Sequence, residues 1–456
     1  SNHSLFRLTG SFFNPGPYSG YLAITLPVAL GILLEQSKRN MPYYLSMGCI
    51  GTAIVVLPAG MSRSAWIAVV VSCAWVYALY RLDRKQAATR LRQHKRWYII
   101  GGILGGILLL GGSASLYTLK KDSADGRFLM WKITTKAIQK QPITGTSLGG
   151  FPAAYAETQA EYMASGKATE QEKLVAGCPE YAFNEYLQIG LEQGLVGLAL
   201  FIGWLGLLFY KGIKNKRYAC CGGLMSMAIF AFSSYPLQLP EFWVVLIFLG
   251  VMSVTPDKDE IRENQAESNG HRWGKQIFFM GIAILGIGLF WMQKDHYKAY
   301  QQWNKAQMFY NNKAYEAALE VYEPLYPLLK HKPEFLFEVA QCLSKTGRYE
   351  KANGYLERAV LLSSDPMLYY VMAKNEQCLG EYRQAEKHLL HAIDILPERI
   401  YPYYLLMNLY TEPSYFQPAK LKKAIDSVLT KKPKVESSAI KEMKEKARSM
   451  LNNTSI

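Results

Sequence analysis

The sequence predicts an all-α protein in which a polytopic bundle of about eight transmembrane helices precedes an α-solenoid of helical repeats. Half of the 456 residues are hydrophobic and only 19% are charged, compared with about 25% charged in an ordinary soluble protein. Long apolar runs fill the first part of the chain, and small residues recur at a fixed interval after Lys294. This composition excludes a disordered chain and a disulfide-rich secreted domain.

Eight apolar runs approach the length of about 17 to 25 residues that crosses a bilayer as a helix. The last two runs are the shortest. The runs are Tyr18 to Leu34, Tyr43 to Ala59, Ser64 to Tyr80, Tyr98 to Tyr117, Tyr186 to Tyr210, Tyr218 to Tyr235, Glu241 to Val254 and Ile277 to Met292.

The positive charge of the chain is concentrated at the ends of these apolar runs. Lys and Arg outnumber Asp and Glu by 51 to 36, and basic clusters occupy 81–96 and 211–217. This placement follows the positive-inside rule and argues against nucleic-acid binding. It predicts a membrane domain over 1–294, with a large outer loop at 118–184, and an outer domain over 295–456. An outer N-terminus without an export signal leads us to expect further membrane helices before Ser1.

The cysteines indicate neither a metal site nor a disulfide framework. The sequence has seven of them and no Cys-x-x-Cys pair, and four lie in apolar runs. Cysteines in such surroundings behave as small buried apolar residues. The cysteines are therefore not expected to bind a metal, and no cofactor is expected.

Alanines recur after Lys294 with steps of 33 or 34 residues, in two series. This interval is typical of tetratricopeptide helix pairs, in which Ala allows two helices to approach closely. Tyr349 and Leu356, and then Tyr382 and Leu389, stand at the supporting positions of two successive repeats. We therefore expect at least three repeats and a polar terminal cap. The alanine series are Ala306, Ala340 and Ala373, and Ala318, Ala352, Ala385 and Ala419.

Two arginines and a tryptophan are the first candidate site residues. Arg63 lies at the outer end of an apolar run, and Arg127 and Trp131 are four residues apart on one face of a predicted helix in the outer loop. Two guanidinium groups can bind the oxygens of a pyrophosphate bidentately. The alternative is that each Arg extends to the membrane surface within an ordinary loop.

Acidic and amide side chains form a second candidate group before the fifth apolar run. Glu185, Gln188 and Glu192 follow a helical spacing that places them on one face, directed into the protein and away from lipid. Asn184 precedes them, and Glu180 lies slightly earlier. The alternative role for these residues is helix capping and hydrogen bonding between helices.

The order of these motifs resembles the O-antigen ligase and polymerase superfamily over roughly Gly10 to Val254. The resemblance implies a metal-independent, inverting glycosyltransferase at the outer face of a bacterial inner membrane. Its donor would be a polyprenyl-diphosphate-linked glycan, and its acceptor a hydroxyl group of a lipid, a glycan or a protein. Arginines matching Arg63 and Arg127 would hold the diphosphate, with Trp131, Asn184 and Gln188 in support. The motifs are Gly10-Ser11-Phe12-Phe13-Asn14-Pro15, Ser62-Arg63-Ser64, Arg127 with Trp131, Pro142 with Gly145 and Gly149, and Asn184-Glu185-Tyr186-Leu187 followed by Glu192 and Gly194.

One residue departs from the family pattern. Ligases of the family have a His before the Asn of the last motif, proposed as the base, whereas this chain has Phe183. Phenylalanine cannot accept a proton. Glu180, Glu185 or Glu192 would then be the base, or a good leaving group would make base assistance unnecessary, or the chain is not a ligase of the usual kind.

Two other functions compete with glycan transfer. The chain could be a catalytically inactive membrane scaffold that recruits envelope-assembly proteins through its repeats, or a transporter with a polar path through its helices. In the enzyme, the repeats would bind a protein partner or the acceptor. We therefore expect deletion of 297–456 to leave the chemistry with a small free acceptor intact. The sequence does not separate ligase, polymerase and protein O-glycosyltransferase.

The positive-inside pattern makes a testable prediction about topology. We expect 81–97 to be cytoplasmic, and both 119–184 and the repeats to be outside. Single cysteines introduced near Gln93 and near Ser165, in a cysteine-free background, should react differently with a membrane-impermeant thiol reagent on intact cells. The Ser165 site should label and the Gln93 site should not; the opposite pattern would reverse the topology.

Overall fold

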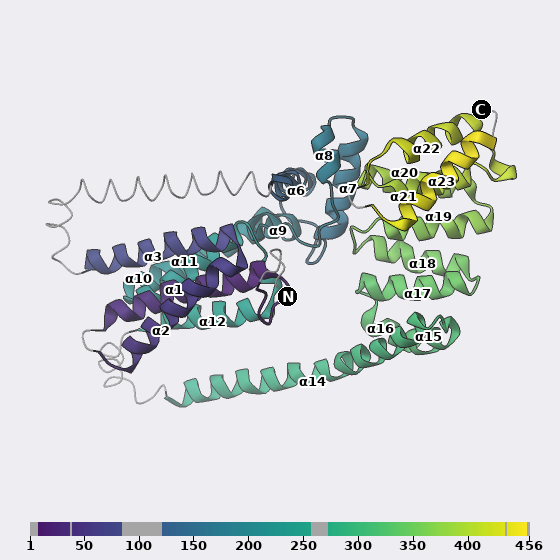
Figure 1. Cartoon of the computed structure of the whole chain (residues 1–456). Helices are drawn as coiled ribbons and strands as arrows, with labels where there is room; N and C mark the ends of the chain where they lie inside the picture. Colours follow the sequence, from purple (N-terminus) through teal and green to yellow (C-terminus); the bar gives the residue numbers. More distant parts are fainter. Residues whose placement is uncertain (1–7, 37–38, 84–120, 257–271, 434–435, 454–456) are drawn as a thin grey trace. The chain divides into compact units, whose positions relative to one another are not determined.

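The computed structural model describes residues 8–36, 39–83, 121–256, 272–433 and 436–453. Every regular element within these residues is a helix (Figure 1). By its internal contacts the chain divides into two compact units. The first comprises Ser1–Arg127, Ile138–Gly145 and Tyr181–Asn269, and the second comprises Phe128–Ala137, Thr146–Glu180 and Gly270–Ile456.

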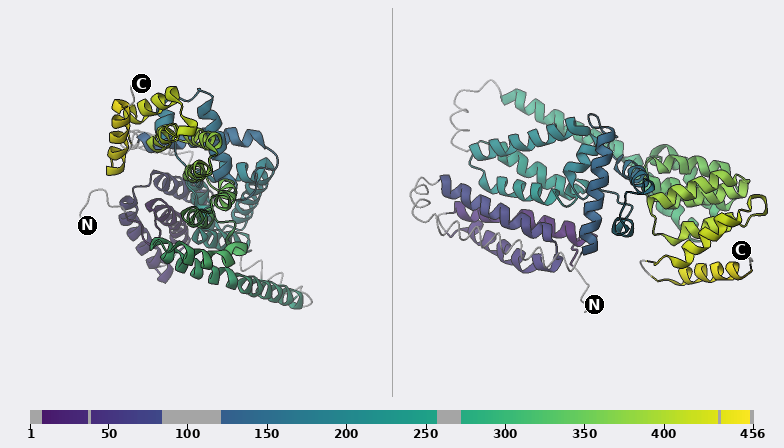
Figure 2. Two further views of the ribbon diagram at one scale, coloured as in Figure 1. Left: turned by 90° about the vertical axis from the view of Figure 1, so that its right-hand side faces the viewer. Right: turned by 90° about the horizontal axis from the view of Figure 1, so that it is seen from above.

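The first unit is a bundle of apolar helices organised around α1 (Pro15–Glu35). Helix α1 packs against α2, α3 and α11, and Figure 2 shows these helices side by side in two further views. Close packing depends on small residues: a Cβ atom at Gly20 would lie 2.2 Å from the Phe230 ring, and one at Gly31 would lie 2.5 Å from Ala219. Membrane helices typically pack through such residues. The other helices are α2 (Met41–Val56), α3 (Arg63–Asp83), α10 (Gly194–Lys214), α11 (Tyr218–Ala231) and α12 (Pro240–Val254).

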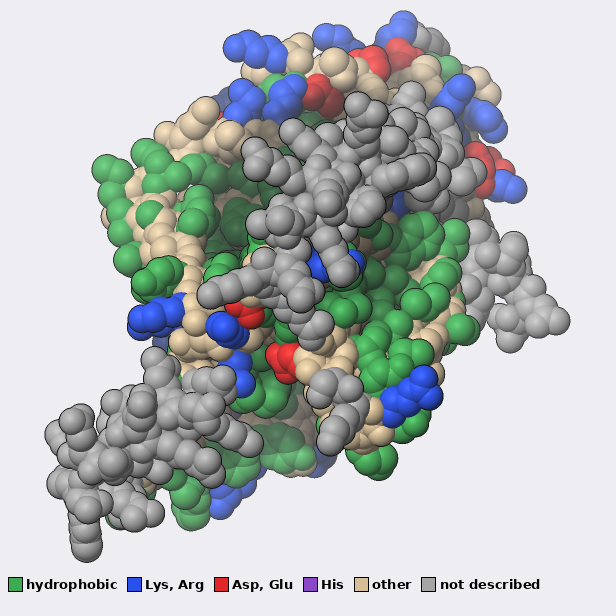
Figure 3. Space-filling view, turned by 90° about the vertical axis from the view of Figure 1, so that its left-hand side faces the viewer, with side chains coloured by type: hydrophobic (Ala, Val, Ile, Leu, Met, Phe, Trp, Pro, Cys, Tyr) green, Lys and Arg blue, Asp and Glu red, His purple; other side chains and the backbone are tan. Residues whose placement is uncertain are grey.

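Four helices in the described residues are long and apolar enough to cross a membrane: α1, α3, α10, and α2 together with the short turn that follows it, Met41–Gly60. Many of their apolar side chains face outward, as on α10, where Leu200 is 70% exposed. Hydrophobic side chains cover wide areas of the surface in Figure 3. These features indicate a membrane protein.

The prediction of about eight spans is not supported. Helices α11 and α12 have 14 and 15 residues, which at 1.5 Å per residue is well short of a hydrocarbon core about 30 Å thick. The predicted span at 98–117 lies outside the described residues, and the one at 277–292 forms part of α14 (Arg272–Asn311). Apolar composition indicated where helices would form, but it overestimated how many would reach the length of a membrane span.

The apolar run at 186–210 is also divided, where the sequence predicted one continuous helix. Helix α9 (Glu185–Glu192) ends before α10 begins at Gly194, which has a φ of +69°. A Cβ atom at Gly194 would lie 2.0 Å from the carbonyl oxygen of Ile143, and one at Gly145 would lie 2.5 Å from the backbone at the end of α9. The glycine-rich turn of the outer loop therefore packs directly against the break.

The second unit contains the tetratricopeptide repeats. The alanines at the predicted positions Ala306, Ala318, Ala340, Ala352, Ala373 and Ala385 are all buried. Ala419 is exposed, and Ala424 is buried instead, so the regular series ends one repeat earlier than its spacing suggested. The helices are the end of α14, α15 (Tyr315–Tyr322), α16 (Tyr326–Leu329), α17 (Pro333–Lys345), α18 (Tyr349–Val360), α19 (Met367–Leu379), α20 (Tyr382–Ile395), α21 (Ile400–Leu409), α22 (Pro418–Thr430) and α23 (Ser438–Asn453).

Part of the outer loop belongs to this second unit by its contacts. Helix α7 (Phe151–Ala164) packs against α20, and the rings of Phe151 and Tyr155 on α7 are fully buried. The boundary between 294 and 295 remains a prediction. Within the described residues, however, the loop segment 146–180 folds with the repeats, so the loop contributes to both units.

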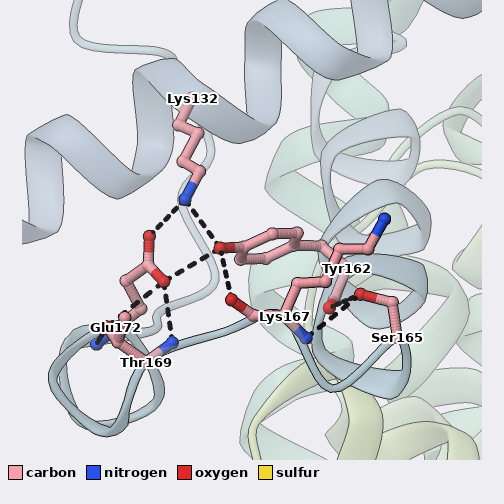
Figure 4. Close-up of polar contacts among 6 residues, drawn as sticks. All are labelled: Lys132, Tyr162, Ser165, Lys167, Thr169 and Glu172. Atoms are coloured by element: carbon pink, nitrogen blue, oxygen red, sulfur yellow. Dashed lines mark hydrogen bonds and ion pairs between the residues drawn. The ribbon is translucent and has the colours of Figure 1, made fainter.

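A polar network joins α6 (Lys121–Lys140) to α7 and α8 (Glu170–Val175) within the second unit. The Nζ atom of Lys132 donates to Glu172 at 2.7 Å and to the hydroxyl of Tyr162 at 2.6 Å. Glu172 also accepts from Tyr162 and from the backbone N–H of Thr169, each at 2.9 Å. These contacts converge between the elements in Figure 4. They fix α6 against the α7–α8 pair.

The network makes the stability of the second unit depend on pH. Burial alone would raise the pKa of Glu172, but the hydrogen bonds from Lys132, Thr169 and Tyr162 lower it to about 2, below its usual value of 4.5. Because the pKa is lowered on folding, this stabilisation is complete above pH 4.5 and is lost as the pH falls toward 2. Glu172→Gln should reduce the unfolding free energy by about 1 kcal/mol at pH 7, and by progressively less below pH 4.5. Thermal unfolding followed by circular dichroism would measure this, and an equal loss at every pH would contradict it.

Candidate functional site

Arg63 and Arg127 lie in the first unit, near enough for the charge of one to act on the other. Arg63 is the first residue of α3 and Arg127 lies on α6, and both side chains are partly buried. Burial lowers the pKa of Arg127, and the positive charge of Arg63 lowers it further. Tyr235 raises this pKa, but by less. Since guanidinium groups stay protonated in proteins, the two charges create a positive potential in a partly desolvated place. A bound anion would relieve this repulsion.

An aromatic cluster surrounds the Arg127 side chain. The Cζ atom of Arg127 lies 5.3 Å from the ring centroid of Phe183, within the range of a cation–π contact. Phe183 contacts Tyr235 edge to face with centroids 4.9 Å apart, and Tyr181 stacks on Tyr235 at 5.2 Å. Asn14 donates to the Tyr235 hydroxyl at 3.1 Å. Phe183 therefore positions a guanidinium group in this chain.

The backbone turns sharply at Phe183. Its φ of +49° lies in the left-handed region, which is unfavourable for a bulky residue and is often found at functional sites. The next residue, Asn184, accepts a hydrogen bond from the backbone N–H of Leu187 at 3.1 Å and caps α9. The turn thus ends in a firmly capped helix whose first residue is Glu185.

Glu185 is buried beside this turn, only 1% exposed. Its carboxylate accepts from the backbone N–H of Leu237 at 2.6 Å and from Nε2 of Gln238 at 3.2 Å. Burial raises the pKa of Glu185 to about 7 even though these two hydrogen bonds oppose the rise, and Glu192 contributes to it. With a pKa of about 7, the carboxyl group can be in either protonation state near neutral pH.

Gln188 and Glu192 stabilise the same turn from within α9. Both are buried, at 3% and 8% exposed. Gln188 accepts from the backbone N–H of Ala182 at 2.9 Å and donates to Glu192 at 3.2 Å. The predicted polar face therefore points into the protein, and its second and third members hold the segment that carries Phe183.

Two other candidates lie in the second unit. The exposed side chain of Glu180 lines a cavity of about 960 Å³ together with residues of the repeats. Trp131 is on the part of α6 that belongs to this unit, one turn after Arg127, and its ring contacts Phe128 edge to face at 6.0 Å. The structure thus brings Arg63, Arg127, Asn184, Glu185, Gln188 and Glu192 together in the first unit.

The sequence did not single out Tyr235, Leu237 or Gln238. They lie at the end of an apolar run and in the short 3-10 turn Pro236–Gln238, where no motif distinguishes them. Only the tertiary structure brings Leu237 and Gln238 to Glu185 and Tyr235 to Phe183. Within the described residues, no group of three or more His, Cys, Asp and Glu side chains could hold a metal ion.

The fold and this cluster define a polytopic membrane protein with a buried basic and acidic site and a helical repeat domain. Residues 47–202 match the family described as O-antigen ligase, so the chain carries an O-antigen ligase domain. Residues 311–392 match the family described as anaphase-promoting complex, cyclosome, subunit 3, which agrees with a tetratricopeptide-like C-terminal domain. No curated protein matches the sequence.

Solved structures of MamA resemble part of the chain. A MamA double mutant from strain RS-1 is 20% identical, covers 34% of this chain and 96% of its own length, and has a TM-score of 0.28. MamA from residue 41 onward, from Desulfovibrio magneticus RS-1, is 19% identical, covers 35% and 98%, and has a TM-score of 0.28. A third MamA structure is 16% identical, covers 34% and 88%, and has a TM-score of 0.25.

Proposed function

We propose that this protein transfers a glycan from a polyprenyl-diphosphate-linked donor to a hydroxyl acceptor at the periplasmic face of the bacterial inner membrane. The observation that carries the proposal is the convergence of Arg63 and Arg127 in the unit that also buries Glu185. The O-antigen ligase domain supports glycan transfer in surface polysaccharide biosynthesis.

The two arginines would stabilise the departing diphosphate. As the bond between the sugar anomeric carbon and the diphosphate oxygen breaks, negative charge accumulates on the diphosphate. Each guanidinium within about 4 Å of that charge contributes at most about 4 kcal/mol near a protein surface, before desolvation. Because the positive charges are already in place, little reorganisation is needed in the transition state. Phe183 would hold Arg127 in position through its ring.

Glu185 would accept the proton of the acceptor hydroxyl. The acceptor oxygen forms a bond to the anomeric carbon on the face opposite the diphosphate, which inverts the configuration, and its proton passes to the Glu185 carboxylate. A base with a pKa of about 7 is well matched to this task at neutral pH. Glu192 lies one hydrogen bond from Gln188 and is the reserve candidate, whereas Glu180 belongs to the second unit.

A catalytically inactive scaffold is the second candidate function, and Phe183 at the position of the expected His favours it. The decisive experiment reconstitutes the purified protein in liposomes with polyprenyl-diphosphate-linked glycan extracted from its own host and a small hydroxyl acceptor. Transfer that releases polyprenyl diphosphate supports the enzyme. If a deletion strain has an unchanged envelope glycan profile and the protein transfers no glycan in liposomes, the result would support the scaffold function instead.

Replacing Arg127 by Lys should lower turnover by about tenfold to a hundredfold. The charge is kept, but an ammonium cannot reproduce the bidentate contact with phosphate or the planar contact with Phe183. Initial rates of transfer in liposomes would measure the effect. Arg217→Lys is the matched control. Arg217 donates to the carbonyl oxygens of Thr255 and Pro256, which directly follow α12 and belong to neither α3 nor α6. Wild-type rates for Arg127→Lys would remove Arg127 from the site.

Replacing Glu185 by Gln should lower turnover by about 10² to 10⁴-fold, the usual effect of losing a general base. The wild-type rate should rise with pH through about 7 as the carboxyl group with that pKa loses its proton, and the variant should lack this rise. Glu192→Gln, which keeps the hydrogen-bonding partner of Gln188, is the comparison variant. If Glu185→Gln retains both the rate and its pH profile, Glu185 is only a structural acceptor for Leu237 and Gln238.

A further inference from the structure

The second unit contains a cavity of about 960 Å³, and every residue that lines it belongs to that unit. Its walls are the first turns of α17, α19 and α21, the linkers that precede α19 and α21, and residues 178 and 180 of the outer loop. Ligand pockets have volumes of about 300 to 1,000 Å³. Arg63, Arg127 and Glu185 belong to the first unit, so the proposed reaction gives this cavity no role.

A non-helical segment of the outer loop forms part of one wall of the cavity. The amide Nε2 of Gln159, which is completely buried, donates to the carbonyl oxygen of Gly177 at 3.0 Å. The hydroxyl of Ser364, in the linker before α19, donates to the carbonyl oxygen of Pro179 at 3.1 Å. Cys178, between these two carbonyl groups, lines the cavity. Buried side chains of this unit therefore already bind the backbone of one peptide segment, and the cavity lies directly beside it.

Tyr370, on α19, directs its hydroxyl group into the cavity. The residue is 4% exposed, and its ring meets that of Tyr401 edge to face at 5.3 Å. The hydroxyl has no hydrogen-bond partner among the described residues, where every fully shielded polar side-chain atom has one. Its oxygen therefore faces open space, which is the cavity that Tyr370 lines. Because buried polar groups in native structures are almost always paired, this hydroxyl indicates a place for a ligand atom.

The charged side chains that line the cavity are mostly acidic. They are Glu180, Glu334, Glu338 and Asp365, together with one base, Arg399. Glu338 already accepts hydrogen bonds from three side chains of the repeats, whereas the other three acids form no ion pair within the described residues. The lining is thus negative, although the chain as a whole has a formal net charge of +15. Charge complementarity favours a cationic ligand.

Aromatic and apolar side chains line much of the remaining wall, among them Phe337, Tyr401 and Leu396. Lys and Arg have a positive charge at the end of a long methylene chain, so they can bury the chain against apolar surface while the charge meets an acid. A ring such as that of Tyr401 also binds cations, and the ammonium group of Lys374 already lies 5.2 Å from its centroid. An acidic group or a neutral sugar would leave the carboxylates of the lining without a counter-charge.

We propose that this cavity binds a peptide segment of a protein partner through a Lys or Arg side chain, whose positive charge meets Glu334 and Asp365. The backbone of the partner would lie beside 177–180, where the Tyr370 hydroxyl can donate to a peptide carbonyl. Burial raises the pKa of Tyr370, so this hydroxyl keeps its proton at neutral pH. Such a site is independent of glycan transfer, because a transferase and a scaffold would both use it to bind a partner.

A selection from random peptides tests the chemistry of the ligand. The probe is a display library of decapeptides, offered to the full chain in phosphatidylcholine nanodiscs after counterselection against empty nanodiscs. Enriched peptides should share a Lys or Arg, and they should bind Glu334→Lys at least tenfold more weakly than wild type, because like charges then meet in the cavity. Glu350→Lys is the matched control and should keep wild-type affinity, since Glu350 is exposed on α18 and does not line the cavity.

Three results of this selection would overturn the proposal: no enrichment, enrichment in Asp or Glu, or equal binding of the enriched peptides to wild type and Glu334→Lys. If Glu334→Lys does not fold, Glu334→Gln replaces it. This variant only removes the negative charge, so it should weaken binding by about threefold to tenfold. Wild-type affinity in Glu334→Gln would then count against the proposal.

Tyr370→Phe tests the unpaired hydroxyl. Loss of one hydrogen bond to the ligand should weaken binding of an enriched peptide by about threefold to tenfold, and the unfolding temperature should not fall, because the hydroxyl has no partner to lose. Tyr410→Phe is the matched control, since the hydroxyl of Tyr410 donates to Glu386 at 2.7 Å within the repeats. It should lower the unfolding temperature and leave the affinity unchanged. Wild-type affinity in Tyr370→Phe, or an equal loss of stability in the two variants, would contradict the assignment.

An array of oligosaccharides, offered to the same nanodiscs, tests the other class of ligand. Binding of an oligosaccharide that Glu334→Lys and Tyr370→Phe both abolish, with no enrichment of basic peptides, would assign the cavity to a glycan and overturn the proposal. Failure of the proposed function gives a different result: the wild-type protein would transfer no glycan in liposomes and would still select basic peptides.

Discussion

The left-handed turn at Phe183 is the constraint on which the site depends. It directs the Phe183 ring to the guanidinium group of Arg127 and leaves Asn184 extended, so that Asn184 can cap α9. Glu185 then begins the helix in a buried place where the backbone N–H of Leu237 meets its carboxylate. If Phe183 relaxed to an ordinary conformation, the ring, the cap and the acid would all change direction.

The acidic and basic side chains of the candidate site differ in whether they can lose their charge. The acid is buried and hydrogen-bonded, and its pKa is raised to about 7, so it can be neutral at little cost. The two arginines cannot become neutral, and the positive charge of Arg63 lowers the pKa of Arg127. Under the proposed function, this difference would favour a diphosphate over a neutral sugar as the group bound at the arginines, and it would leave the acid available to the acceptor.

Glycines and small polar residues connect this site to the helices that carry it. Gly145 and Gly194 let the outer loop contact the break between α9 and α10 more closely than any side chain would permit. In the second unit, the buried amide of Gln159 makes a comparable link with hydrogen bonds, because it donates to the carbonyl oxygens of Gly177 and of Ile395 at the end of α20.

Periodic features were predictable from the sequence because they depend on local spacing. Alanine steps of 33 and 34 residues indicated the repeats, and the buried alanines of α17 to α20 follow them until Ala419, where the terminal repeat loses its regularity. The apolar runs indicated membrane helices, but not that the run at 218–235 would end as a helix of 14 residues. The length of a helix depends on turns such as those at Gly194 and Pro236, which are set by contacts with other segments.

The sequence by itself determined the class of the protein, the polar face of α9 and the two arginines, since each rests on residue type and helical period. Only the tertiary structure decided that Arg63 and Arg127 come together, that Tyr235, Leu237 and Gln238 complete the site, and that Glu180 folds with the repeats. These pairings join residues that are far apart in the chain, such as Asn14 with Tyr235, 221 positions later. No local pattern encodes such a pairing, because it arises from which helices pack together and how closely their small residues allow them to approach.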